Sequence, residues 1–115
     1  MLSRLTIAAA IALTPAAALA HHGWSSYDDT RTLTVNAPLA AVNWGNPHGS
    51  ATVTWQKRSW HVVLAPVARM SARGLTREML APNKVVTLIG YPRKDGTAEI
   101  RIERVIVDGK TVELR

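Results

Sequence analysis

Four histidines carry the most concentrated metal-coordinating chemistry in this 115-residue sequence. His21 and His22 are adjacent, His48 lies in a segment rich in Gly, Asn and Pro, and His61 lies in an alternating apolar segment. Imidazole nitrogens suit copper, zinc and nickel, and copper competes most strongly among the divalent ions. If His21 opened the mature chain, its amine and imidazole would chelate Cu(II), and a further imidazole would complete a histidine brace. All four histidines are therefore candidate ligands for copper or zinc.

A simpler interpretation of the histidines stays open. His48 would brace the turn around Asn46-Pro47, and His61 would be an ordinary surface residue. A terminal His-His pair also binds copper adventitiously. Spacing along the sequence does not decide between these alternatives, because the fold determines which imidazoles meet.

The first twenty residues have the pattern of a secretory signal peptide. A short basic start, Met1–Arg4, precedes the apolar run Leu5–Leu13, and Pro15 then interrupts any helix. The small residues of Ala18-Leu19-Ala20 predict cleavage after Ala20, which would make the protein periplasmic or secreted. No segment after the leader approaches the ~20 apolar residues that span a bilayer, so the mature chain is expected to have no transmembrane segment.

The composition excludes several classes of site. The chain has no cysteine, which excludes disulfides, CxxCH haem attachment and thiolate metal sites. Lys and Arg outnumber Asp and Glu by 14 to 8. Outside the cytoplasm this charge does not point to nucleic acid as a partner, but to anionic lipid heads, cell-wall polymers or an acidic envelope protein. A solubilising surface charge is the simpler explanation.

The apolar pattern after the leader is typical of a small β domain. Residues 21–31 are expected to form an extended arm, and residues 32–115 a single domain. We expect a long first strand from Arg31 to Trp44, with a bulge near Ala37-Pro38. Further strands are expected at 51–56, 60–64, 84–91, 98–107 and 111–114.

A short helical connection is expected within residues 66–80. Gly74 would end the first turns, and Thr76 would cap a second short turn. Three strands, a helical connection and two further strands give the order of an OB-fold. The sequence therefore predicts a mainly β, OB-fold-like barrel of five to six strands with a short helical connection between strands 3 and 4. A meander packed on one short helix is the main alternative.

Three arginines are spaced four residues apart at Arg69, Arg73 and Arg77. In a continuous helix they would share one face and grip a phosphate or carboxylate of a partner. Gly74 is expected to interrupt that helix, and a solvated basic ridge is the simpler interpretation. The outer positions of the strand at 98–107 are expected to form cross-strand ion pairs: Glu99, Arg101 and Glu103.

The tryptophans divide into two kinds. Trp55 and Trp60 fall on the inward phase of their strands and are expected to pack in the core. Trp24 lies in the polar arm beside Tyr27, where it would dock the arm onto the barrel. The alternative for Trp24 is stacking against a sugar.

Several short motifs occur in one order along the chain. They are HHGWSSYD after the leader, WGNPHG at the end of the first strand, LAPVARMSARGLT before the strand at 84–91, and IRIERVIVDGKTVELR at the end. Together they resemble a family of small exported bacterial proteins catalogued as domain of unknown function 6152. The resemblance covers essentially the whole mature chain and implies no catalytic residues. Ala37-Pro38 stands where a Gly-Thr pair is expected.

No catalytic motif is apparent in the sequence. No G-x-S-x-G elbow surrounds Ser25 or Ser26, and there is no H-E-x-x-H and no Gly-rich phosphate loop. We therefore expect an exported binding or accessory module without enzymatic turnover, which binds copper or zinc through its mature N-terminal histidine. The alternative is a structural adaptor that binds an envelope protein or an anionic surface through the Arg69–Arg77 region, without a metal.

Overall fold

Seven strands and a short helical connection make up residues 23–115, the part of the chain that the computed structural model describes. The elements follow in the order η1 (Trp24–Ser26), β1 (Leu33–Pro38), β2 (Ala40–Asn43), β3 (Ser50–Trp55), β4 (Arg58–Val63), α2 (Val67–Ala72), η2 (Glu78–Leu80), β5 (Val85–Pro92), β6 (Glu99–Val107) and β7 (Lys110–Glu113). Within these residues, no helix has the length and hydropathy needed to cross a bilayer.

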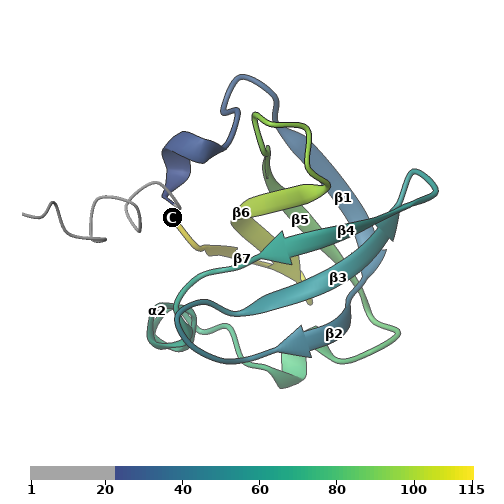
Figure 1. The fold of residues 1–115 in the computed structure, drawn as a ribbon. Helices are drawn as coiled ribbons and strands as arrows, with labels where there is room; N and C mark the ends of the chain where they lie inside the picture. The colour runs from purple at the N-terminus through teal and green to yellow at the C-terminus, as the bar shows by residue number, and fades with distance from the viewer. Residues whose placement is uncertain (1–22) are drawn as a thin grey trace, which may run out of the picture.

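The strands form one curled sheet in the order β1-β5-β6-β4-β3-β2, and β7 pairs with β6 beside this path (Figure 1). All the pairs are antiparallel except β4 with β6, which is parallel. β1 and β2 lie at the two ends of the order, although only Leu39 separates them in the chain. With α2 and η2 between β4 and β5, this arrangement confirms the predicted OB-fold-like barrel. It has seven strands rather than five or six.

The first strand is divided, which accounts for part of the difference in strand number. Val35, Ala37 and Leu39 are buried in alternation, and the register of β2 against β3 then shifts after Ala40. Ala41 has a φ of 49°, which turns the backbone at this bend. The bulge was predicted near Ala37-Pro38, but Pro38 still pairs with β5 as the last residue of β1. Proline fits at a strand end, where its missing N–H is not needed for a ladder hydrogen bond.

The predicted strands at 51–56 and 60–64 place the turn between them at residues 57–59. In the structure this turn, between β3 and β4, begins one residue earlier. Gln56 and Lys57 have φ values of 51° and 59°, the left-handed pair typical of a type I′ hairpin turn. Arg58 therefore begins β4 instead of belonging to the turn. This geometry matches the right-handed twist of the two strands, so the hairpin continues the sheet to its tip.

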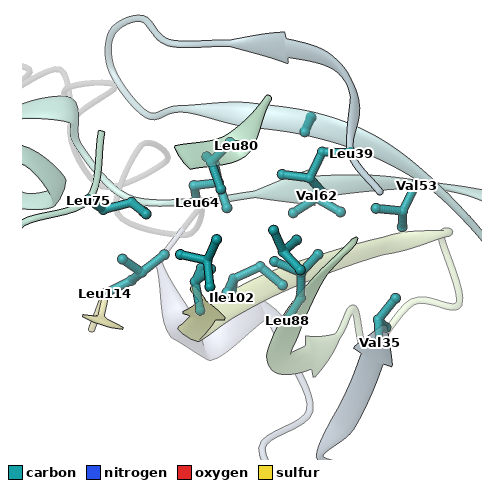
Figure 2. Close-up of a cluster of buried hydrophobic side chains, with 14 of the residues drawn as sticks. Val35, Leu39, Val53, Val62, Leu64, Leu75, Leu80, Leu88, Ile102 and Leu114 are labelled. Atoms are coloured by element: carbon teal, nitrogen blue, oxygen red, sulfur yellow. The ribbon is translucent and has the colours of Figure 1, made fainter. Parts of the chain in front are cut away.

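The helical connection covers one end of the barrel with apolar side chains. α2 ends before Gly74, whose φ is 86°, and the Leu75 N–H donates to the Met70 carbonyl at 2.9 Å. The Thr76 hydroxyl accepts from the Met79 N–H at 3.4 Å, as its predicted capping role requires. Figure 2 shows side chains of this connection meeting those of the strands in the core: Leu64, Leu75, Leu80, Leu88, Ile102 and Leu114.

Candidate functional site

The N-terminal arm packs against the far end of β5. The Asp28 N–H donates to the Pro92 carbonyl at 2.8 Å, and the Lys94 N–H donates to the Ser26 carbonyl at 3.0 Å. Tyr27 is only 4 % exposed. The described part of the arm is therefore part of the folded domain.

Trp24 fixes the start of this arm. Its ring centroid lies 4.7 Å from the guanidinium carbon of Arg101 and 4.6 Å from that of Arg115. The ring also meets Tyr91 edge to face, at a centroid distance of 6.1 Å. Each guanidinium over an indole contributes about 0.5–1 kcal/mol at such sites. As Figure 1 shows, the C-terminus lies close to the arm, and the predicted docking role of Trp24 is confirmed.

Arg101 lies beneath the arm rather than on an open surface. Its neighbours Ile100 and Ile102 are fully buried in the core, so the alternation of the strand directs Arg101 to the outer face. There it is 6 % exposed, because Trp24 and Tyr27 cover its guanidinium. The prediction of a surface ion pair missed this burial. The sequence signal for this burial was the pair of aromatic residues in the arm, Trp24 and Tyr27. We call the group Trp24, Tyr27, Tyr91, Arg101 and Arg115 the arm site.

Two tyrosine–glutamate hydrogen bonds border the arm site. The Tyr27 hydroxyl donates to Glu99 at 2.6 Å, and Arg93 lies 3.3 Å from the same carboxylate. Burial, together with this hydrogen bond and the charge of Glu99, raises the pKa of Tyr27 to about 12. The Tyr91 hydroxyl donates to Glu103 at 2.8 Å, and that bond raises the pKa of Tyr91. Both phenols therefore remain protonated donors at neutral pH.

His48 lies near this group, in the loop between β2 and β3. The Gly49 N–H donates to the Ala65 carbonyl at 2.9 Å, which fixes the loop at the end of β4. Burial lowers the pKa of His48, and the positive charges of Arg101 and Arg69 lower it further. The imidazole is consequently neutral at pH 7, with a lone pair available to a hydrogen-bond donor or a metal.

The lowered pKa of His48 makes stability depend on pH in a definite direction. Below about pH 6.5 a histidine in the unfolded chain binds a proton, whereas His48 in the native state resists protonation. Its contribution to the free energy of unfolding should therefore fall as the pH falls below about 6.5. Urea denaturation at a series of pH values should show a shallower acid decline for His48→Asn than for wild type. Equal slopes would contradict this prediction.

Of the other three predicted ligands, only His61 lies within the described residues 23–115. His61 is exposed on the outer face of β4. His21 and His22 lie outside the described residues. Within residues 23–115, no cluster of three or more His, Asp or Glu side chains forms that could hold a metal ion.

Two of the three spaced arginines bind the C-terminal segment. Arg69 Nη1 donates to the Leu114 carbonyl at 3.1 Å, and Arg73 Nη1 donates to the Glu113 carbonyl at 2.8 Å. Arg77 lies beyond the end of α2 and lines a pocket of about 290 Å³ beside the bend between β1 and β2. The connection therefore separates Arg77 from the other two, as the position of Gly74 predicted. Arg69 and Arg73 hold α2 against the last residues of the chain.

The comparisons with known proteins identify the family without assigning an activity. A search of curated proteins found no match. The model of the family of unknown function DUF6152 matches residues 9–101, from the predicted leader to Arg101 in β6. This range includes Trp24, Tyr27 and His48. Because the match covers most of the sequence, the chain belongs to the family of unknown function DUF6152.

Proposed function

We propose that this chain is an exported binding module, periplasmic or secreted and without enzymatic turnover, that holds a copper or zinc ion at its mature N-terminus. His21 would supply its amine and imidazole, and His48 would supply a ligand from the fold. One observation supports this proposal most. Trp24 is anchored on Arg101, and Arg101 is also one of the two cations that act on His48.

Chain connectivity limits how far the terminal ligands can move from this anchor. His22 lies two residues before Trp24, a span of at most about 7 Å between Cα atoms. Metal–nitrogen bonds are about 2.0–2.1 Å long, so all ligands must converge on one point. An arm fixed at Trp24 raises the effective concentration of the terminal ligands near His48, which lowers the entropic cost of bringing them together.

The charges around His48 determine how much of the metal affinity would come from His48 and how much from the terminal amine and imidazole. The guanidinium groups of Arg69 and Arg101 oppose a bare dication, although together with burial, the larger cause, they also lower the pKa of His48. The terminal amine and imidazole must therefore contribute most of the affinity. Copper is favoured over zinc at such nitrogen ligands. An exchangeable anion on the metal would offset the positive surroundings.

Calorimetry with Cu(II) alone on processed protein tests the proposal. Mass spectrometry first establishes that the chain begins at His21, and we then expect about one equivalent of tightly bound copper. A serine inserted between Ala20 and His21 moves the amine away from the imidazole. This variant should bind copper at least about tenfold more weakly. His48→Asn should lower the affinity by a smaller factor.

His61→Asn is the matched control, because it removes an exposed imidazole that the proposal does not use. Its affinity should stay within about twofold of wild type. If the inserted serine left the affinity unchanged, the terminal chelate would be wrong. If His48→Asn had no effect, the fold would contribute no ligand.

A further inference from the structure

The acidic residues of this chain are absent from one long stretch of its sequence. No Asp or Glu occurs between Asp29 and Glu78, a region that includes β1, β2, β3, β4 and α2. The same stretch contains six basic side chains: Arg31, Lys57, Arg58, Arg69, Arg73 and Arg77. Arg69 and Arg73 bind carbonyl oxygens of the C-terminal segment. The cations at the tip of the β3–β4 hairpin are directed to solvent instead.

That hairpin tip combines positive charge with two indoles, Trp55 and Trp60, which are half-buried because they pack in part against the core, as predicted. Lys57 and Arg58 are exposed, and the Arg58 guanidinium carbon lies 5.0 Å from the ring centroid of Trp60. Trp55 and Trp60 lie 5.7 Å apart, and the Trp60 indole N–H donates to the Trp55 carbonyl at 3.1 Å. Because this hydrogen bond satisfies the indole N–H of Trp60, the ring can be buried further without leaving an unpaired donor.

The shape of the tip also bears on its partner. Figure 1 shows the β3–β4 turn projecting beyond the rest of the barrel. A pocket of about 480 Å³ lies beside the bend of the first strand, lined by Leu39 and Pro82 and by Thr54 at the base of the tip, and no tip residue lines it. A convex tip does not enclose a small ligand, but it fits a surface that yields around it. Indole rings favour the interfacial zone of bilayers, and each Lys or Arg near an anionic leaflet contributes about 1 kcal/mol.

We propose that the hairpin tip, Trp55–Trp60, docks on the anionic headgroups of a phospholipid bilayer. Lys57 and Arg58 contact phosphate groups, and the two indoles lie at the headgroup level. The nearest acidic side chain in the sheet register is Glu99, opposite His61, and it is bound by Tyr27 and Arg93. It therefore does not neutralise the tip. This surface is separate from the arm site and does not depend on metal binding.

Vesicle co-sedimentation of the processed chain tests the proposal. The protein should sediment with vesicles of equal parts phosphatidylglycerol and phosphatidylcholine, and not with phosphatidylcholine alone. Lys57→Glu/Arg58→Glu should weaken binding at least about tenfold. Lys57→Gln leaves the Arg58 contact with Trp60 in place and should weaken binding about fivefold. If the double variant folds poorly, Lys57→Gln still measures the contribution of the tip to vesicle binding.

A matched control separates the tip from the overall charge of the protein. Arg31→Glu/Lys94→Glu changes the net charge equally, at exposed residues that both act on Asp28. This pair should bind vesicles within about twofold of wild type. Equal losses in both pairs, or no binding to anionic vesicles at low salt, would overturn the proposal. Unchanged binding by the tip variants would also overturn the proposal, because another surface would then hold the vesicles.

Because the chain has no cysteine, a dye attached to one introduced cysteine reports how deeply that position enters the bilayer. A polarity-sensitive dye on Gln56→Cys, which keeps both cations, should shift to the blue with anionic vesicles. The same dye on Ser25→Cys, in η1, should not shift. A shift at position 25 alone would contradict docking through the hairpin.

Discussion

Gly90→Ala should lower the free energy of unfolding by more than about 3 kcal/mol. Gly90 lies in β5 opposite Ile102, at the point where the register with β6 shifts. A Cβ at this position would lie 2.8 Å from the carbonyl carbon of Arg101 and 2.9 Å from the Cα of Ile102, and closer still to the Arg101 carbonyl oxygen. These are main-chain atoms in the central strand, so they cannot rotate away. Urea denaturation measures the loss.

Gly45→Ala is the matched control for this prediction. Its Cβ would lie 3.0 Å from Oδ1 of Asn43, which belongs to a side chain that can change rotamer. The expected cost is below about 1 kcal/mol. Similar losses for the two variants would contradict the close approach of β5 and β6. Because Arg101 would shift with its strand, Gly90→Ala should also loosen the arm.

Trp24→Ala is expected to cost about 2–3 kcal/mol and to release the arm. A fully buried tryptophan loses more on truncation, but Trp24 is half-buried. The variant removes the contacts of the indole with Arg101, Arg115 and Tyr91. Urea denaturation gives the global loss. Hydrogen exchange should be faster at the Lys94 amide, which bonds to the arm.

Two controls separate the ring from the rest of the arm. Trp24→Phe keeps an aromatic ring between the same neighbours and should retain more than half of the stability that Trp24→Ala loses. Ser25→Ala changes an exposed neighbour and should have little effect. Unchanged exchange at Lys94 in Trp24→Ala would show that the arm is held elsewhere. Under the proposed function, Trp24→Ala should also weaken copper binding.

The barrel was predictable because its core follows a period of two. Val53 and Val62, and Ile100 and Ile102 in β6, alternate with outer residues as half-buried strands require. The break at Leu39 was placed one or two residues early. A change of phase shows that a strand bends, but the residue at which it bends depends on which partners it can reach.

The arm site was only partly predictable from the sequence. Trp24 beside Tyr27 indicated an aromatic arm, but the cover over Arg101 comes from residues more than seventy positions earlier in the chain. Tyr91 and Arg115 carried no local signal at all. Similarly, the sequence placed His48 in a turn, but its pKa is lowered first by burial and then by the charges of Arg101 and Arg69, which the fold brings close. Contacts of this kind are set by topology rather than by spacing.

The divided first strand also constrains the order in which this barrel assembles. Residues Leu33–Pro38 pair with Val85–Pro92, about fifty positions further along the chain, whereas Ala40–Asn43 needs only the next hairpin. When the chain is synthesised from its N-terminus, β1 therefore has no strand to pair with until β5 has been made. The pairing of β1 with β5 joins residues far apart in the sequence, and such pairings slow folding. Because the chain has no cysteine, no disulfide can hold β1 near β5 before the two strands pair.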